Sequence, residues 1–218
     1  NIVGSINVLE GARQAESERV VFAASGGTLY GEPAPEDLPV RESHAQQPLS
    51  PYGVAKKSVI DYLVAYREMH ALEFCALALG NVYGPRQDPH GEAGVVAIFA
   101  QRIVRGEPVT IFGDGEQTRD FVFVDDVVDG FVRAATRGGG LVCNIGTGCE
   151  TSVNHLFATM VAQAGADVTP VMAPERPGEL RRSCLDNERA AIQLGWRPWT
   201  ELGDGTRAVL EFVAERPD

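Results

Sequence analysis

Arg19-Val20-Val21-Phe22-Ala23-Ala24-Ser25-Gly26-Gly27-Thr28-Leu29-Tyr30-Gly31 is the segment of this 218-residue chain from which its fold class is predicted. Residues 19–24 are a short apolar run with two β-branched residues, a pattern that predicts a buried strand. Ser25 and two glycines follow directly. Open α/β sheets bind their ligands at the carboxyl ends of the strands. The stretch therefore predicts an α/β fold with a site near Ser25.

A second segment, Ser50-Pro51-Tyr52-Gly53-Val54-Ala55-Lys56, is predicted to begin a helix that runs to about residue 70. Pro51 suits the first turn because its missing N–H would have no partner there. Tyr52 and Lys56 then share one face, about 6 Å apart along the axis. An ammonium near a phenol lowers the pKa of the phenol, which makes Tyr52 a candidate general base or acid for an alcohol. The alternative is an ordinary surface pair of Tyr and Lys.

Four motifs together resemble a known family. Ser25, Tyr52 and Lys56 resemble the Ser–Tyr–Lys triad of the short-chain dehydrogenase/reductase superfamily. Residues 22–31, 50–56, 80–87 (Gly-Asn-Val-Tyr-Gly-Pro-Arg-Gln) and 118–127 (Thr-Arg-Asp-Phe-Val-Phe-Val-Asp-Asp-Val) are similar to its extended branch, the NAD-dependent epimerase/dehydratase family. Within that branch the chain most resembles the UDP-glucose 4-epimerases. The resemblance extends from Asn1 to the last helix.

This resemblance implies a function and a set of site residues. The function is NAD-dependent epimerisation of a nucleotide sugar at C4, of the UDP-glucose/UDP-galactose type, through a 4-keto intermediate. The implied catalytic residues are Ser25, Tyr52 and Lys56, and the implied cofactor-binding residues are Ala23, Ala24, Tyr52 and Lys56. The implied substrate-binding residues are Asn81, Phe99, Phe112, Arg119, Arg176 and Glu179.

Each substrate-binding residue also has an ordinary interpretation. Arg119 and Arg176 stand where the family grips the diphosphate, and an Arg fork suits that group; the alternative is a surface ion pair. Asn81 could be a turn residue. The two phenylalanines could be core aromatics, and Glu179 stands where the family often has Asp.

The residues after Ser25 bear on the type of reaction. The 4,6-dehydratases of the family carry an Asp-Glu pair there, whereas this chain has Gly26 and Gly27. A simple redox cycle is therefore favoured. A UDP-glucuronate decarboxylase or a dehydratase stays open within the enzymes. A non-catalytic dinucleotide-binding fragment or sensor stays open in another class.

For the fold, the resemblance implies a Rossmann-like doubly wound parallel sheet with a smaller α/β substrate-binding region. Residues 1–87 are expected to belong to the NAD-binding domain. Residues 88–218 are expected to be mainly substrate-binding, with some segments returning to the sheet. No G-x-G-x-x-G fingerprint is present, so we expect about 90 residues with the first strands to be missing upstream and NAD binding by these residues alone to be weak. A homodimer through helices near 1–15 and 51–70 is also implied.

Further along the chain, apolar periodicity and turn residues predict alternating helices and strands. The predicted helices cover about 94–105, 125 onward, 152–164, 185–194 and 202–214. The predicted strands include 73–79, 109–112, 119–124, 141–145 and 170–173. Trp196 and Trp199 are expected on the surface of the smaller region.

Composition limits the partners. The net charge of −11 argues against nucleic acid or an anionic membrane. No apolar run reaches 18 residues and no leader peptide is visible, so a cytoplasmic protein is expected. The four cysteines and four histidines lack metal-ligand spacing, so no metal site is predicted.

Overall fold

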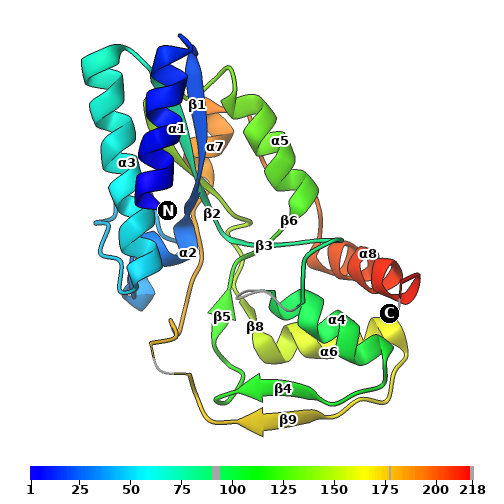
Figure 1. Ribbon diagram of the computed structural model, residues 1–218. Helices are drawn as coiled ribbons and strands as arrows, with labels where there is room; N and C mark the ends of the chain where they lie inside the picture. Colours follow the sequence, from blue (N-terminus) through cyan, green and yellow to red (C-terminus); the bar gives the residue numbers. More distant parts are fainter. Residues whose placement is uncertain (90–93, 177, 217–218) are drawn as a thin grey trace.

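The computed structural model describes residues 1–89, 94–176 and 178–216. Its helices are α1 (Ile2–Gln14), α2 (Gly26–Leu29), α3 (Pro51–His70), α4 (Val95–Val104), α5 (Val124–Ala134), α6 (Val153–Ala164), α7 (Glu188–Gln193) and α8 (Leu202–Ala214), with a 3-10 turn at Pro35–Asp37. Its strands are β1 (Arg19–Ser25), β2 (Glu73–Leu79), β3 (Asn81–Tyr83), β4 (Val109–Phe112), β5 (Thr118–Arg119), β6 (Phe121–Phe123), β7 (Leu141–Ile145), β8 (Thr151–Ser152) and β9 (Pro170–Ala173) (Figure 1).

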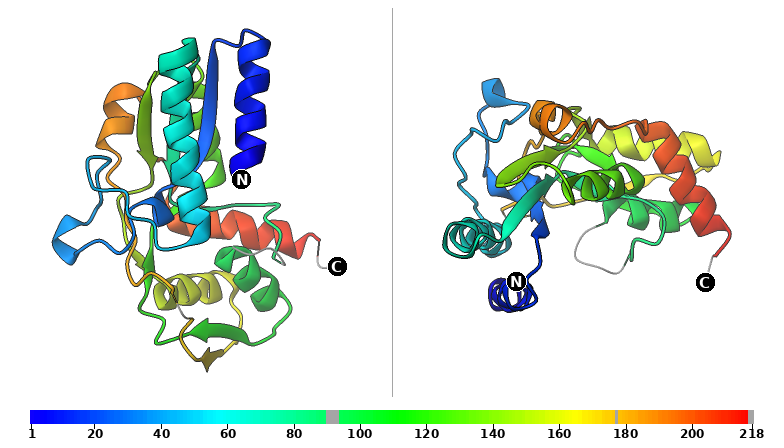
Figure 2. Two further views of the ribbon diagram at one scale, coloured as in Figure 1. Left: turned by 60° about the vertical axis from the view of Figure 1, so that its left-hand side comes forward. Right: turned by 90° about the horizontal axis from the view of Figure 1, so that it is seen from above.

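A parallel three-stranded sheet in the order β1-β2-β7 forms the upper part of the molecule in Figure 1. Helices α1 and α3 cover one face, and α5 and α7 cover the other (Figures 1 and 2). Each face has its own apolar cluster, one around Leu63 and Phe74, the other around Leu77 and Trp196. The Rossmann-like α/β fold predicted from the sequence is confirmed.

The lower part of the molecule is built on α4, α6 and α8, with the parallel pair β4-β9 at its outer side (Figure 1). These helices pack around a third apolar cluster that includes Phe99, Ile103, Leu156 and Leu210. Two short strand pairs, β3-β6 and β5-β8, connect the two parts. The chain returns to the upper sheet at β7 before it completes the lower part, so neither part is one continuous segment.

Local sequence signals set several helix ends. The Ser50 Oγ accepts a hydrogen bond of 3.1 Å from the Gly53 N–H at the start of α3, and the Ser152 Oγ accepts one of 3.1 Å from the His155 N–H at the start of α6. Side-chain oxygens at this position satisfy N–H groups that have no partner within the helix. The predicted starts of these two helices are confirmed.

Two expectations were wrong, both because of contacts between distant segments. The helix expected over 185–194 begins only at Glu188, since the Val40 N–H donates to the Cys184 carbonyl and the Asp186 N–H donates to the Val40 carbonyl, each at 2.9 Å. Trp196 is fully buried beside the sheet rather than on the surface. Its Nε1 donates to the main-chain carbonyl of Asp126 at 2.7 Å, so the ring closes the space between α5 and α7.

The three strands of the sheet end level with one another. Ser25 pairs with Leu79, and Leu79 pairs with Ile145. A glycine follows each strand end, and two of these glycines, Gly80 and Gly146, lie so close to one buried residue that a side chain would collide with it. That residue is Asp120, which is described below with the site.

Candidate active site

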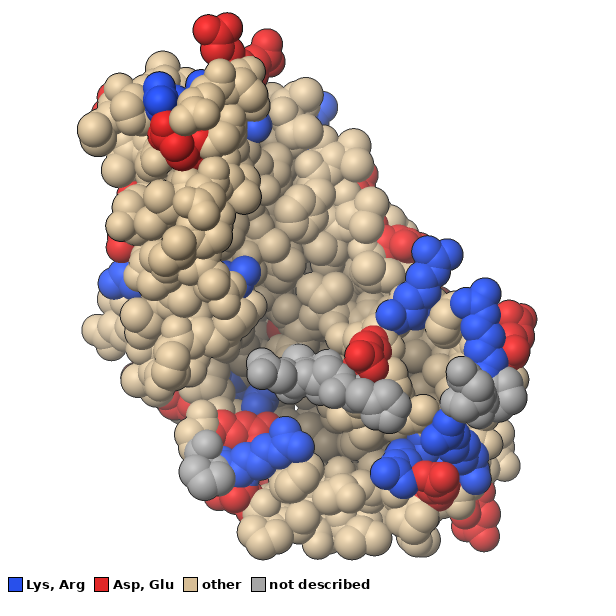
Figure 3. Space-filling view, in the orientation of Figure 1, with Lys and Arg blue, Asp and Glu red and all other residues tan. Residues whose placement is uncertain are grey.

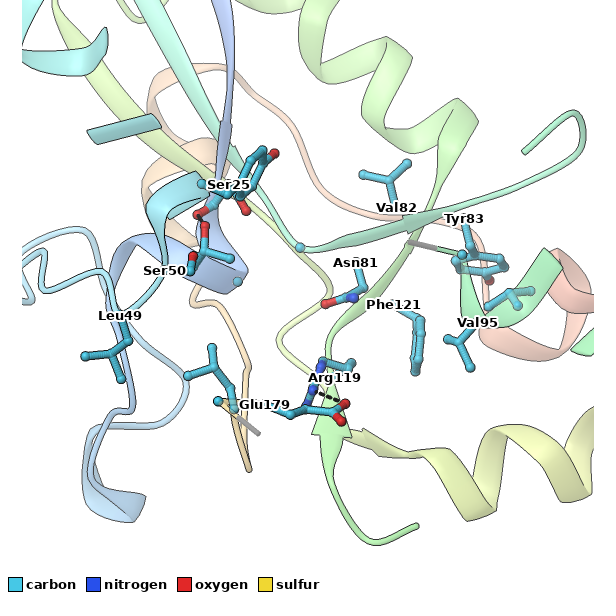
Figure 4. Close-up of a pocket in the computed structure, with 18 of the residues that line it drawn as sticks. Ser25, Leu49, Ser50, Asn81, Val82, Tyr83, Val95, Arg119, Phe121 and Glu179 are labelled. Carbon is cyan, nitrogen blue, oxygen red and sulfur yellow. Dashed lines mark hydrogen bonds and ion pairs between the residues drawn. The ribbon is translucent and has the colours of Figure 1, made fainter. Parts of the chain in front are cut away.

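A cavity of about 610 Å³ lies at the carboxyl ends of β1 and β2, between the upper and lower parts. Five residues predicted from the sequence line it: Ser25, Tyr52, Asn81, Arg119 and Glu179. Figure 4 shows Ser25 on one side, Arg119 and Glu179 on another, and Asn81 between them. Residues that are far apart in the chain are therefore brought to one site.

Tyr52 and Lys56 are presented by the first turns of α3. Tyr52 is 48% exposed. The Lys56 Nζ lies 5.6 Å from the centre of the Tyr52 ring and donates a hydrogen bond of 2.9 Å to the Ala23 carbonyl on β1. Partial burial lowers the pKa of the Lys56 ammonium. The helix thus holds a phenol at the cavity and an ammonium between that phenol and the strand.

Gly53 is what allows α3 to approach the Ser25 loop, a function that the sequence analysis did not assign to it. A Cβ at this position would lie 2.9 Å from the Thr28 carbonyl oxygen and 2.8 Å from the Pro48 side chain. The close approach places the start of α3 against the segment that follows Ser25. The glycine inside the Tyr-x-x-x-Lys motif was the available signal, because glycine is unfavourable within a helix unless packing requires it.

Asp120 is the main site-supporting residue that the sequence analysis missed. It is fully buried, and its carboxylate accepts hydrogen bonds from the Thr147 N–H and hydroxyl, both at 2.7 Å, and from the N–H groups of Gly148 and Leu185. Burial raises the pKa of this carboxyl, and the four donors oppose that shift. Four donors to two oxygens fit the ionised form.

The position of Asp120 links three parts of the site. Its main-chain carbonyl accepts a hydrogen bond of 2.7 Å from the Asn81 N–H, and Arg119 precedes it in the chain. Its side chain holds the turn after β7 and the segment at Leu185. A single buried acid therefore connects Asn81 and Arg119, which both line the cavity, to the sheet. Its place in the Thr-Arg-Asp-Phe motif, directly before the apolar run of residues 121–124, was the signal available in the sequence.

The structure gives Phe99 a different role from the one expected. Phe99 is 2% exposed and packs edge-to-face against Phe157, with ring centres 5.9 Å apart. It does not line the cavity in the described structure, because the inward face of α4 points it into the lower apolar cluster. The interpretation as a core aromatic accounts for it.

Arg176 and Phe112 lie outside the cavity lining but contact each other. The Arg176 guanidinium carbon is 3.9 Å from the centre of the Phe112 ring, a cation–π contact. Arg176 is exposed, three residues after the end of β9 and three residues before Glu179. The pair is therefore near the cavity without being part of its wall.

Comparison with known proteins agrees with this architecture. The model of the NAD dependent epimerase/dehydratase family matches residues 1–146. The chain belongs to this family. It is 48% identical over 217 residues to a UDP-glucose 4-epimerase of Mycolicibacterium smegmatis. The aligned region is 99% of this chain and 69% of that protein.

Solved members of the family have the same fold. A UDP-glucose 4-epimerase of Thermotoga maritima, solved with UDP-glucose, superposes with a TM-score of 0.96 at 44% identity. The superposed region is 98% of this chain and 69% of the Thermotoga maritima chain. A UDP-glucose 4-epimerase of Thermus thermophilus, solved with NAD, gives a TM-score of 0.92 at 38% identity. The superposed region is 97% of this chain and 68% of the Thermus thermophilus chain.

No group of three or more His, Cys, Asp or Glu side chains within the described ranges is arranged to hold a metal ion. None of the described helices is long and apolar enough to cross a membrane.

Proposed function

We propose that this chain catalyses NAD-dependent epimerisation of a nucleotide sugar at C4, of the UDP-glucose/UDP-galactose type. The observation that carries the proposal is the meeting of Ser25, Tyr52, Asn81 and Arg119 in one cavity, in a chain 48% identical to a UDP-glucose 4-epimerase. The cavity volume of about 610 Å³ lies within the range of small-molecule sites.

In this proposal Tyr52 takes the proton of the sugar C4 hydroxyl and later returns it. Its exposed phenol lines the cavity, where an alcohol can reach it. Ser25 hydrogen-bonds the same sugar oxygen, and the Lys56 ammonium lies 5.6 Å from the centre of the Tyr52 ring. Asn81 and Arg119 hold the diphosphate end, where a guanidinium offers a charged fork.

The residues present fit NAD, which the family uses. Ala23 and Ala24, at the carboxyl end of β1, would hold it together with Tyr52 and Lys56. Among the described residues, one of the three Lys56 ammonium hydrogens has an acceptor, the Ala23 carbonyl, so two remain for hydroxyls of a ribose. When bound, NAD⁺ supplies reversible hydride exchange at the sugar C4. We further propose that residues 1–87 form the cofactor side and residues 88–218 mainly the sugar-nucleotide side, with α5, β7 and α7 packed in the upper part.

The test is interconversion of UDP-glucose and UDP-galactose in the presence of NAD⁺. Formation of either sugar nucleotide from the other supports the proposal. Release of CO₂ from UDP-glucuronate, without interconversion, would instead assign the decarboxylase alternative. Binding of NAD without turnover of any nucleotide sugar would assign the sensor alternative. Titration of the chain with NAD⁺ alone gives the affinity of these 218 residues for the cofactor.

We also propose a cytoplasmic homodimer that forms through α1 and α3. These helices contact each other, and they expose large apolar side chains: Val3, Val8, Val54, Val64 and Met69 are each 46–73% exposed. Figure 3 shows few charged side chains over these two helices away from their upper ends. Apolar surface of this kind is typical of protein interfaces. The cytoplasm agrees with four cysteines that form no disulfide.

Changing Val64 to Glu tests the dimer. A charge buried against an apolar partner surface is costly, so we expect the dimer dissociation constant to rise by more than ~10-fold. Sedimentation equilibrium of the parent and the variant gives the constant. Val171→Glu is the matched control, because Val171 is 53% exposed on β9, away from α1 and α3. Equal constants for the parent and Val64→Glu would contradict the proposed interface.

A further inference from the structure

The cavity contains one basic and one acidic side chain among the described residues that line it, Arg119 and Glu179. The chain as a whole has a net charge of −11, so any anionic group that enters must be attracted locally. Among the described lining residues, Arg119 is the only one with a positive charge. The side chain that pairs with the Arg119 guanidinium therefore affects the binding of anionic groups.

Glu179 occupies that guanidinium. The Arg119 Nη2 donates to the Glu179 Oε1 at 2.8 Å, and the dashed line in Figure 4 marks this pair. The two side chains are 15% and 25% exposed, so the pair is largely shielded from water. The Nη1 donates to the Thr118 carbonyl at 2.7 Å and holds the guanidinium in place. Burial lowers the pKa of Arg119, and the negative charges of Glu179 and Glu32 oppose that effect.

We propose that Glu179 is an internal competitor for Arg119, which weakens the binding of phosphate groups in the cavity in proportion to their charge. The inference rests on the proposed function, since it concerns the diphosphate of a nucleotide sugar. An incoming phosphate either displaces the Glu179 carboxylate or binds beside it. In the first case an ion pair is broken, and in the second two like charges stay close in a partly desolvated site.

This competition has a consequence for turnover. An epimerase binds a substrate and releases a product that differ at one carbon, and both carry the same diphosphate. A carboxylate that returns to Arg119 as the diphosphate leaves assists that release. The site would then favour exchange of nucleotide sugars over tight retention.

The experiment measures the affinities of uridine, UMP and UDP for the parent chain and for Glu179→Gln by calorimetry. Gln has nearly the same size and keeps an oxygen that can accept from Arg119, so the change removes charge and preserves packing. Uridine is the reference, because its affinity reports any contact of residue 179 with the nucleoside. Relative to the change for uridine, we expect the affinity for UMP to rise ~3-fold and that for UDP to rise ~10-fold. A merely structural role would change all three affinities together.

Glu175→Gln is the matched control. Glu175 is exposed four residues earlier on the same segment and does not line the cavity, so its loss should leave the UDP affinity within ~2-fold of the parent value. If the parent binds UDP as tightly as Glu179→Gln does, or more tightly, the inference is overturned while the proposed function stands. If neither protein binds UDP, both are overturned.

Discussion

Changing Tyr52 to Phe is expected to lower the rate of epimerisation by about 10³-fold or more, within the range for loss of a general acid–base group. The expected affinity for UDP changes by less than ~2-fold, because the phenol serves the sugar hydroxyl and not the diphosphate. Tyr52 is 48% exposed and caps no buried network, so the fold should be unaffected. Removing one oxygen atom therefore separates catalysis from binding.

The measurement is the rate of UDP-galactose conversion under saturating NAD⁺, together with UDP affinity by calorimetry. Tyr62→Phe is the matched control on the same helix. Tyr62 is 39% exposed and does not line the cavity, so its loss should leave the rate unchanged. If Tyr52→Phe kept more than a tenth of the parent rate, the proposed role of the phenol would be wrong.

Changing Asp120 to Asn is expected to lower the free energy of unfolding by ~3 kcal/mol, since hydrogen bonds to a charged group contribute ~1.5–3 kcal/mol each. The carboxylate accepts four hydrogen bonds, and an amide presents one oxygen where two are needed. The NH₂ group of the asparagine would replace one carboxylate oxygen and would face N–H or O–H donors, from which it cannot accept a hydrogen bond. For a chain of this length the expected fall in Tm is about 6–12 °C.

Thermal and urea unfolding of the two proteins measure this effect. Asp125→Asn is the matched control, because Asp125 is exposed in the first turn of α5 and its expected cost is below ~1 kcal/mol, that of a charge at a helix N-terminus. UDP affinity should fall in Asp120→Asn as well, since Asn81 and Arg119 are held next to this residue. A loss of stability below ~1 kcal/mol would show that the buried acid is not the link between the sheet and the site.

The sequence was sufficient for features that depend on neighbouring residues. The strand at 19–24, the helix that begins after Ser50 and its cap all follow from short-range patterns. Tyr52 and Lys56 lie on one face of α3 because a helical turn places residues four apart together. Motifs that are local in the chain therefore predicted the family and much of the site.

Other features required segments that lie far apart in the chain to meet. Trp196 is buried because α5 and α7 leave space beside the sheet, and Phe99 packs inward because α4 faces α6. Contacts of this kind leave no periodic pattern and no fixed residue spacing in the sequence from which they could be predicted.

The order of the elements, the α/β fold and the residue types that carry the proposed chemistry could all be predicted from the amino-acid sequence. That Asp120 joins the strand ends, and that Glu179 pairs with the guanidinium of Arg119 from 60 residues away in the chain, became visible only in the folded structure. The physical reason is that burial and pairing of charges depend on distances in space. Such distances are set only when the chain has packed.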